Sequence, residues 1–162
     1  MRAPKFRFTL HLLHFFALFA VSSVRADPNF AILKYFGVAM EDGRFPAASV
    51  IQASDGAFYG TTLSNASTAF AVVYKVRPDG TFSTLHTFVG APGDGQAPRS
   101  RLVEGFDGAI YGTTTGGGTN NFGTVFKVNK DGTGYSVLHV FAGPANDGRV
   151  PYGLTQGSDG LL

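Results

Sequence analysis

The 162-residue chain contains no cysteine and no tryptophan, and only 15% of its residues are charged. Without cysteine the protein forms no disulfide, and thiolate metal sites and cysteine nucleophiles are excluded. Because hydrophobic residues make up 44% of the chain, the composition also excludes an intrinsically disordered protein. We therefore expect about one domain of ordinary size, stabilised by strand pairing and apolar burial.

Basic residues are scarce outside the amino end. Four of the 13 lysines and arginines lie within residues 1–26, which leaves nine against all 11 acidic residues. Residues 27–162 therefore carry a formal charge of about −2. A chain without excess positive charge is poorly suited to bind nucleic acid, and we expect no nucleic-acid partner.

The first 26 residues have the pattern of a secretory signal peptide. Three basic residues, Arg2, Lys5 and Arg7, precede an apolar run from Phe8 to Val21, and Val24-Arg25-Ala26 forms a cleavage site before Asp27. An uncleaved membrane anchor is the alternative, but a helix of this length covers about 21 Å against a hydrocarbon core of about 30 Å. We predict a signal-peptide helix at 1–26, no transmembrane span afterwards, and export to the periplasm, cell surface or medium.

The rest of the chain repeats with a period of about 52 residues. Asp55-Gly56 returns at intervals of 52 as Asp107-Gly108 and Asp159-Gly160, and 13 of 28 positions are identical between residues 53–80 and 105–132. The segment Leu85 to Phe88 returns after 53 residues as Leu138 to Phe141, with the extra residue placed at Gly134. The predicted domain, 27–162, divides into the end of a unit (30–45), two full units (46–97 and 98–150) and the start of a third (151–162).

Each full unit contains four short segments with the composition of β-strands. In the first unit these are residues 47–53, 57–63, 70–76 and 81–89, separated by turns rich in glycine, proline and aspartate. No segment after residue 26 has the length and periodicity of a helix. We predict an all-β fold of antiparallel four-stranded repeats forming a partial β-propeller-like array. A β-solenoid is the alternative, although hairpin turns at each reversal favour a meander.

The number of units sets a further expectation. About 2.6 units fit between residues 27 and 162, whereas a closed propeller typically needs four or more. A unit without a neighbour exposes an apolar face and a strand edge. We therefore expect a fragment of a longer repeat protein, or a product that associates with itself.

The repeated motifs resemble the GloVer tandem repeat of secreted bacterial proteins. The second unit carries the whole pattern: Tyr111-Gly112-Thr113-Thr114, Gly116-Gly117-Gly118, Gly123-Thr124-Val125-Phe126-Lys127 and Leu138-His139-Val140-Phe141. The first unit departs from the pattern at residues 64–66 and 71–74. The resemblance implies an exported or surface β-repeat protein and no established activity.

The ionisable residues of the repeats favour structural roles. Eight Asp-Gly dipeptides match tight turns better than calcium loops, with Asp94 and Asp147 the best-placed acids for a cation. His86 and His139 occupy equivalent strand positions, where a packed or hydrogen-bonded histidine is more common than a zinc ligand. Lys75 and Lys127 are interpreted as solvated strand charges. We predict no metal and no cofactor.

Binding by loops is the favoured function. The Gly-rich segment 116–121 lacks the ending of a phosphate-binding loop, and no Gly-x-Ser-x-Gly motif is present. We predict a noncatalytic exported repeat protein whose loops bind a glycan, a protein or a surface component, with Tyr111, Asn120 and Asn121 as the candidate binding residues. The alternative is part of a propeller lyase or hydrolase whose catalytic residues lie in other blades.

Overall fold

The computed structural model describes residues 31–37, 42–63, 70–90, 92–145 and 147–162. The description below concerns the compact unit Ile32–Leu162. The predicted signal peptide lies outside the described residues. Among those residues, no helix has the length and apolar character needed to cross a membrane.

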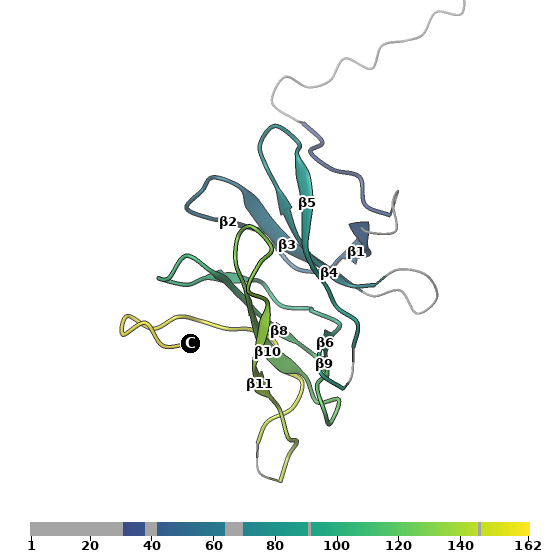
Figure 1. Cartoon of the computed structure of the whole chain (residues 1–162), viewed down its shortest axis with the longest axis vertical. Helices are drawn as coiled ribbons and strands as arrows, with labels where there is room; N and C mark the ends of the chain where they lie inside the picture. Colours follow the sequence, from purple (N-terminus) through teal and green to yellow (C-terminus); the bar gives the residue numbers. More distant parts are fainter. Residues whose placement is uncertain (1–30, 38–41, 64–69, 91, 146) are drawn as a thin grey trace, which may run out of the picture. The chain divides into compact units, whose positions relative to one another are not determined.

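The first sheet is built from one unit of the repeat. Strands β2 (Ile51–Gln52), β3 (Phe58–Leu63), β4 (Val72–Val76) and β5 (Phe82–Thr87) pair in chain order, all antiparallel. A further short strand, β1 (Arg44–Pro46), pairs with the end of β3. Figure 1 shows this sheet in blue and teal.

The second sheet repeats the first. Strands β7 (Val103–Glu104), β8 (Ile110–Thr114), β10 (Thr124–Val128) and β11 (Ser136–Val140) form the same antiparallel meander, drawn in green in Figure 1. The short strands β6 (Gly95–Gln96) and β9 (Gly116–Gly117) pair beside it. A β-solenoid stacks parallel strands, whereas every pairing among the described strands is antiparallel. The predicted all-β antiparallel fold is confirmed, and the described residues contain no α-helix.

The Asp-Gly turns close the first hairpin of each unit. Asp55 accepts a hydrogen bond from the Ala57 amide at 3.2 Å, and Gly56 adopts a φ of 77° that glycine reaches without strain. Asp107 and Gly108 repeat this geometry, with a bond of 3.1 Å to the Ala109 amide and a φ of 78°. The turn prediction is confirmed.

The first strand of each unit is much shorter than predicted. Residues 47–53 were expected to be extended and paired, but only Ile51–Gln52 pair as β2. The chain bends just before this segment, because Phe45, which precedes Pro46, has a φ of 57°. The equivalent residues Ala97 and Val150, each also before a proline, have φ values of 55° and 56°. Non-glycine residues seldom adopt this conformation, so its recurrence marks a built-in bend of the repeat.

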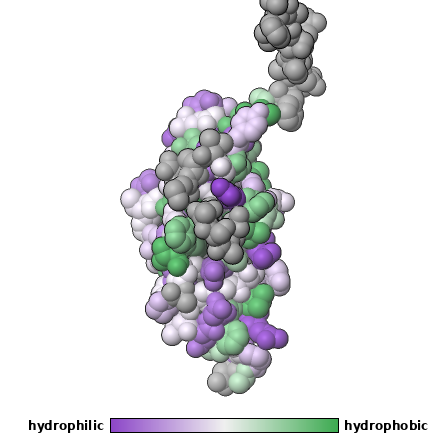
Figure 2. All heavy atoms as spheres, turned by 90° about the vertical axis from the view of Figure 1, so that its right-hand side faces the viewer, coloured by the Kyte–Doolittle hydropathy of each residue, from purple (hydrophilic) through white to green (hydrophobic). Residues whose placement is uncertain are grey.

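The two sheets share one hydrophobic core. Tyr59, Val73 and Phe88 of the first unit belong to the same buried cluster as Ile110 and Phe126 of the second. Of these, Tyr59, Val73, Ile110 and Phe126 have no exposed surface. Each sheet therefore depends on its neighbour for apolar burial, as expected for a repeat array. The face in Figure 2 shows hydrophobic side chains in separate patches among polar ones.

Candidate functional site

Each full unit contains a hydrogen-bonded aspartate, tyrosine and lysine. In the first unit, Asp55 accepts hydrogen bonds from Lys75 Nζ at 2.7 Å and from the Tyr59 hydroxyl at 2.9 Å. The second unit repeats the set with Asp107, Lys127 and Tyr111 at 2.7 and 2.8 Å. These residues lie on the Asp-Gly turn, the second strand and the third strand, so the cluster ties three parts of one sheet together.

The contacts of this cluster perturb its carboxylates. Burial raises the pKa of Asp55, but hydrogen bonds from Lys75, Tyr59 and the Ala57 amide outweigh it and lower the pKa to about 2. Hydrogen bonds from Lys127 and Tyr111 lower the pKa of Asp107 to about 2 as well. Both acids therefore stay ionised over the whole physiological range.

The interpretation of Lys75 as a solvated strand charge was wrong. Its residue exposure is 9%, because β4 lies inside the sheet between β3 and β5 and its ammonium group turns to Asp55. Lys127 makes the same ion pair with Asp107. Both lysines therefore hold their own unit together, and neither protects a sheet edge.

A second repeated pair joins the end of a unit to the next Asp-Gly segment. The pairs are Lys34 with Asp42 at 2.9 Å, His86 with Asp94 at 3.1 Å, and His139 with Asp147 at 2.7 Å. The hydrogen-bonded roles predicted for His86 and His139 are confirmed.

The middle pair lies at the contact between the two units. The His86 ring stacks on Tyr135 with centroids 3.3 Å apart and an interplanar angle of 6°, and the Tyr135 hydroxyl donates to Asp94. Asp94 also accepts from the backbone amides of Val89 and Gly95, at 2.8 and 2.6 Å. One buried carboxylate is thus bound by both units.

Burial sets the protonation of this contact. It lowers the pKa of His86 despite the nearby charge of Asp94, and it raises the pKa of Tyr135, with the hydrogen bond to Asp94 acting in the same direction. A neutral histidine and a neutral tyrosine therefore face the carboxylate.

The geometry around the Asp-Gly acids is that of structural contacts. Asp94 and Asp147, the acids best placed for a cation from the sequence, both accept hydrogen bonds from a histidine and from backbone amides. Within the residues that the structure describes, no three histidine, aspartate or glutamate side chains lie close enough to hold a metal ion.

The three predicted binding residues do not form one surface. Tyr111 is 9% exposed and its hydroxyl binds Asp107, while Asn121 uses its side-chain oxygen to accept from the Gly117 amide at 2.7 Å. Asn120 is exposed on the same loop as Asn121. Tyr111 and Asn121 therefore have structural partners, and a binding role for the three residues stays a prediction.

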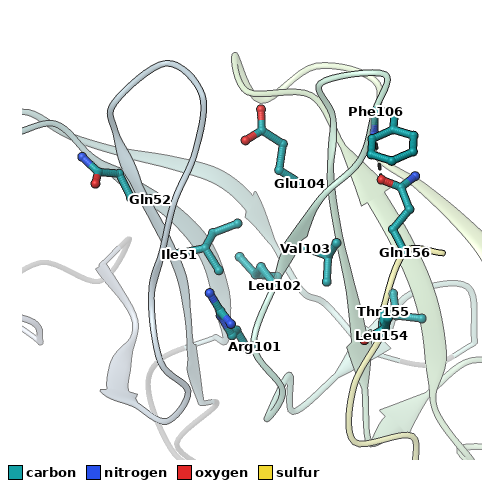
Figure 3. A pocket seen from close by; sticks show the side chains of 10 residues that line it. All are labelled: Ile51, Gln52, Arg101, Leu102, Val103, Glu104, Phe106, Leu154, Thr155 and Gln156. Carbon is teal, nitrogen blue, oxygen red and sulfur yellow. Dashed lines mark hydrogen bonds between the residues drawn. The ribbon is translucent and has the colours of Figure 1, made fainter. Parts of the chain in front are cut away.

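A groove of about 400 Å³ crosses β2, β7 and the segment that contains Leu154, Thr155 and Gln156, which belong to three successive units. It is lined by the residues labelled in Figure 3: Ile51, Gln52, Arg101, Leu102, Val103, Glu104, Phe106, Leu154, Thr155 and Gln156. Gln52, Glu104 and Gln156 occupy equivalent positions, three residues before each Asp-Gly turn. The groove therefore carries a glutamine or glutamate at the same position of each unit.

Two of these polar side chains connect neighbouring units. Glu104 accepts from the Ser54 amide at 2.8 Å, and Gln156 accepts from the equivalent Phe106 amide at 3.0 Å. Glu104 also forms an ion pair with Lys130, which donates to the Ser54 hydroxyl at 2.8 Å. Burial raises the pKa of Glu104, but hydrogen bonds from Lys130 and Ser54 outweigh it and lower the pKa, so the side chain is ionised. The ammonium group of Lys130 balances this negative charge.

Arg101 and Phe106 are the groove residues best placed to contact a ligand. In the part of the chain that the structure describes, the Arg101 guanidinium has no hydrogen bond or ion pair, and Figure 3 shows it beside Ile51 and Leu102. The Phe106 ring is 76% exposed. Sequence reasoning missed this groove, because its residues come from three units and only the recurrence of glutamine or glutamate before each turn signals it.

Comparison with known proteins gives one family. A family model described as the Gloeobacter/Verrucomicrobia repeat matches residues 17–162. Neither the curated proteins nor the solved structures contain a match. The match covers every described residue, and a repeat family is consistent with the two repeated sheets. The chain thus belongs to the Gloeobacter/Verrucomicrobia repeat family.

Proposed function

We propose that this protein is an exported, noncatalytic repeat protein that binds an acidic polysaccharide in the groove that crosses its three units. The observation that carries the proposal is that one groove contains both Arg101, which has no hydrogen bond or ion pair among the described residues, and the exposed aromatic residue Phe106. Export rests on the signal-peptide pattern of residues 1–26.

The charge of the groove favours an anionic ligand. Glu104 is neutralised by Lys130, so Arg101 contributes the uncompensated charge of the lining. A guanidinium binds a carboxylate through two parallel hydrogen bonds, which makes a uronic acid a fitting partner. The exposed Phe106 ring offers an apolar surface for the carbon-bound face of a sugar.

The length of the groove favours a polymer over a single sugar. Its lining comes from residues 51–52, 101–104, 106 and 154–156, which belong to three successive units. Gln52 and Gln156 also line the groove, and their side-chain amides donate to the Gly56 and Gly160 carbonyls at 3.2 and 2.9 Å, which holds the lining in place. A chain molecule that runs across the units would contact all of these groups.

The remaining ionisable groups support a binding role. Asp55, Asp94 and Asp107 are each held by neighbouring side chains and backbone amides. A general acid or base must exchange a proton with a substrate, and carboxylates engaged in this way are poorly disposed to do so.

Binding can be measured by affinity electrophoresis of the secreted protein in gels containing polygalacturonate or neutral amylose. We expect retardation by polygalacturonate only, weakened at least about tenfold by Arg101→Gln because the carboxylate loses its ionic partner. Phe106→Ala should weaken binding to a smaller extent. Arg99→Gln is the matched control, because Arg99 is exposed in the same unit and does not line the groove.

Equal retardation by both polysaccharides, or unchanged binding of Arg101→Gln, would contradict the proposed ligand. Export is tested separately by mass spectrometry of the secreted product. We expect Asp27 as the first residue, and a product that retains Met1 would contradict cleavage.

A further inference from the structure

Each unit ends in a short motif, and the first two copies of this motif contact the following unit. The motif is Leu33-Lys34-Tyr35-Phe36 before the first sheet, Leu85-His86-Thr87-Phe88 on and after β5, and Leu138-His139-Val140-Phe141 on and after β11. The first two copies are covered by the next unit in the chain, and they define what a covered motif looks like.

The phenylalanine of each covered motif packs on two rings of the next unit. Phe36 lies 4.8 Å from Tyr74 and 6.0 Å from Phe82, between ring centroids. Phe88 repeats this with Phe126 at 5.1 Å and Tyr135 at 6.2 Å. The same aromatic trio is therefore built twice.

The basic residue of each covered motif lies against one of those rings. Lys34 Nζ is 4.2 Å from the Phe82 centroid, and His86 stacks on the equivalent Tyr135 at 3.3 Å. The backbones of the two units also come close together. A Cβ atom added to the turn glycine Gly132 would lie 3.3 Å from the Leu85 carbonyl oxygen. The covering unit thus places an aromatic ring on Lys34 or His86 and a turn glycine against the backbone of the motif.

The third copy of the motif is assembled in the same way but is exposed. His139 forms its pair with Asp147 at 2.7 Å and meets Phe141 edge to face at 4.7 Å, as His86 meets Phe88 at 4.9 Å. Leu138 is 51% exposed against 8% for Leu85. The His139 side chain is 49% exposed against 18% for His86.

We propose that Leu138, His139, Phe141 and Asp147 form a docking surface for a further β-repeat of this family, which places a tyrosine or phenylalanine ring on His139. We call these four residues the β11 docking surface. Its partner is specified by chemistry: a four-stranded antiparallel unit with an aromatic residue at the position of Phe82 and Tyr135. This inference does not depend on the proposed polysaccharide ligand.

The path of residues 151–162 favours this partner. The Phe106 amide bonds to Gln156 at 3.0 Å as the Ser54 amide bonds to Glu104 at 2.8 Å. Thr113 donates to the Pro151 carbonyl at 3.3 Å as Thr61 donates to that of Pro98 at 3.4 Å. The first segment of a following unit therefore already lies beside the second sheet, in the geometry that joins the first sheet to the second.

A second copy of the chain is the less suitable partner. The two rings that could cover His139, Phe82 and Tyr135, are already occupied by Lys34 and His86 of their own chain. A docking copy would have to break one of these contacts before it could form the new one.

The test lengthens the chain after Leu162 with a second copy of residues 111–162, since Leu162 occupies the position of Ile110. The added copy carries glutamine in place of its histidine, so that the modified peptide containing His139 cannot be confused with its copy. The rate of His139 modification by diethyl pyrocarbonate, followed by mass spectrometry, should fall about tenfold relative to the natural chain. Replacing the added copy of Tyr135 by alanine should restore most of the rate.

A second variant keeps the test possible if the first lengthened chain does not fold. It inserts an extra copy of residues 99–151 after Pro151, again with glutamine for the added histidine, and so keeps both natural ends. Unchanged reactivity of His139 in a folded lengthened chain would overturn the proposal, as would failure of both variants to fold where the natural chain folds. Protection of the natural chain that rises with its own concentration would assign the surface to a second copy and also overturn it.

Discussion

The two full units have the same motifs but differ in how deeply the neighbouring unit buries them. Lys75 and Asp55 have side-chain exposures of 11% and 31%, whereas Lys127 and Asp107 have 31% and 43%. The distance between the charged atoms is 2.7 Å in both pairs. The local sequence therefore sets the geometry of a contact, and the neighbouring unit sets its burial and hence its contribution to stability.

The largest difference between the units is expected at the phenylalanine of the last-strand motif. Phe88 is 3% exposed and packs on Phe126 and Tyr135, so Phe88→Ala should lower the free energy of unfolding by about 3–5 kcal/mol. Its counterpart Phe141 is only partly buried, and Phe141→Ala should cost about 1 kcal/mol. Urea unfolding followed by circular dichroism measures both, and equal losses would show that the second unit does not bury Phe88 as described.

The next effect concerns the hydroxyl that joins the units. Tyr135→Phe keeps the ring on His86 but removes the donor to the buried Asp94, so it should cost about 1–2 kcal/mol in the same assay. The equivalent position of the first unit is already a phenylalanine, Phe82, stacked under Lys34. A loss indistinguishable from zero would show that the hydrogen bond from Tyr135 to Asp94 does not stabilise the contact and that only the ring stacking does.

Acid should weaken the aspartate, tyrosine and lysine clusters. The folded pKa of Asp55 is about 2 against its usual 3.8, so its contribution is complete above pH 3.8 and is lost as the pH falls toward 2. Asp55→Asn should remove about 1 kcal/mol at pH 7 and flatten the stability profile between pH 4 and 2. A variant that loses stability equally at pH 2 and pH 7 would show that the carboxylate charge is not the cause.

The smallest effect is expected near neutral pH, at the contact between units. Burial lowers the pKa of His86 below its usual 6.5, so the folded state favours the neutral ring. Its contribution is therefore present above pH 6.5 and decreases as the pH falls through the lowered pKa. Between pH 7 and 5 the unfolding free energy should fall by less than about 1 kcal/mol. His86→Gln should flatten this slope, and an unchanged slope would assign it to other groups.

These comparisons also explain what the sequence could predict. The Asp-Gly turns were predictable because Asp55 bonds an amide two residues away and Gly56 needs a positive φ, both local properties. The repeat itself followed from spacing. The buried ion pair of Lys75 was not predictable from its neighbours, because its partner lies 20 residues away and is placed by strand pairing.

The candidate site needed the arrangement of whole units. Arg101 and Phe106 lie in a groove that also takes residues from the units before and after, so no single repeat contains it. Tyr111 and Asn121 were predicted for binding because both lie on or near a Gly-rich loop; the structure adds that the Tyr111 hydroxyl binds Asp107 and that the Asn121 side-chain oxygen accepts from the Gly117 amide, and their binding role stays a prediction. A polar residue in a loop indicates a ligand site only when its hydrogen bonds are not already made within the chain.

Native-state hydrogen exchange of β5 and β11 tests the central claim most directly, namely that a unit is stabilised by the unit that follows it. Among the described strands, β5 pairs only with β4 and β11 only with β10, and the two strands carry equivalent motifs. The hydrogen-bonded amides of β5 should exchange at least about tenfold more slowly than those of β11, because the second unit covers the first. Equal exchange rates in the two strands, or faster exchange in β5, would contradict the account.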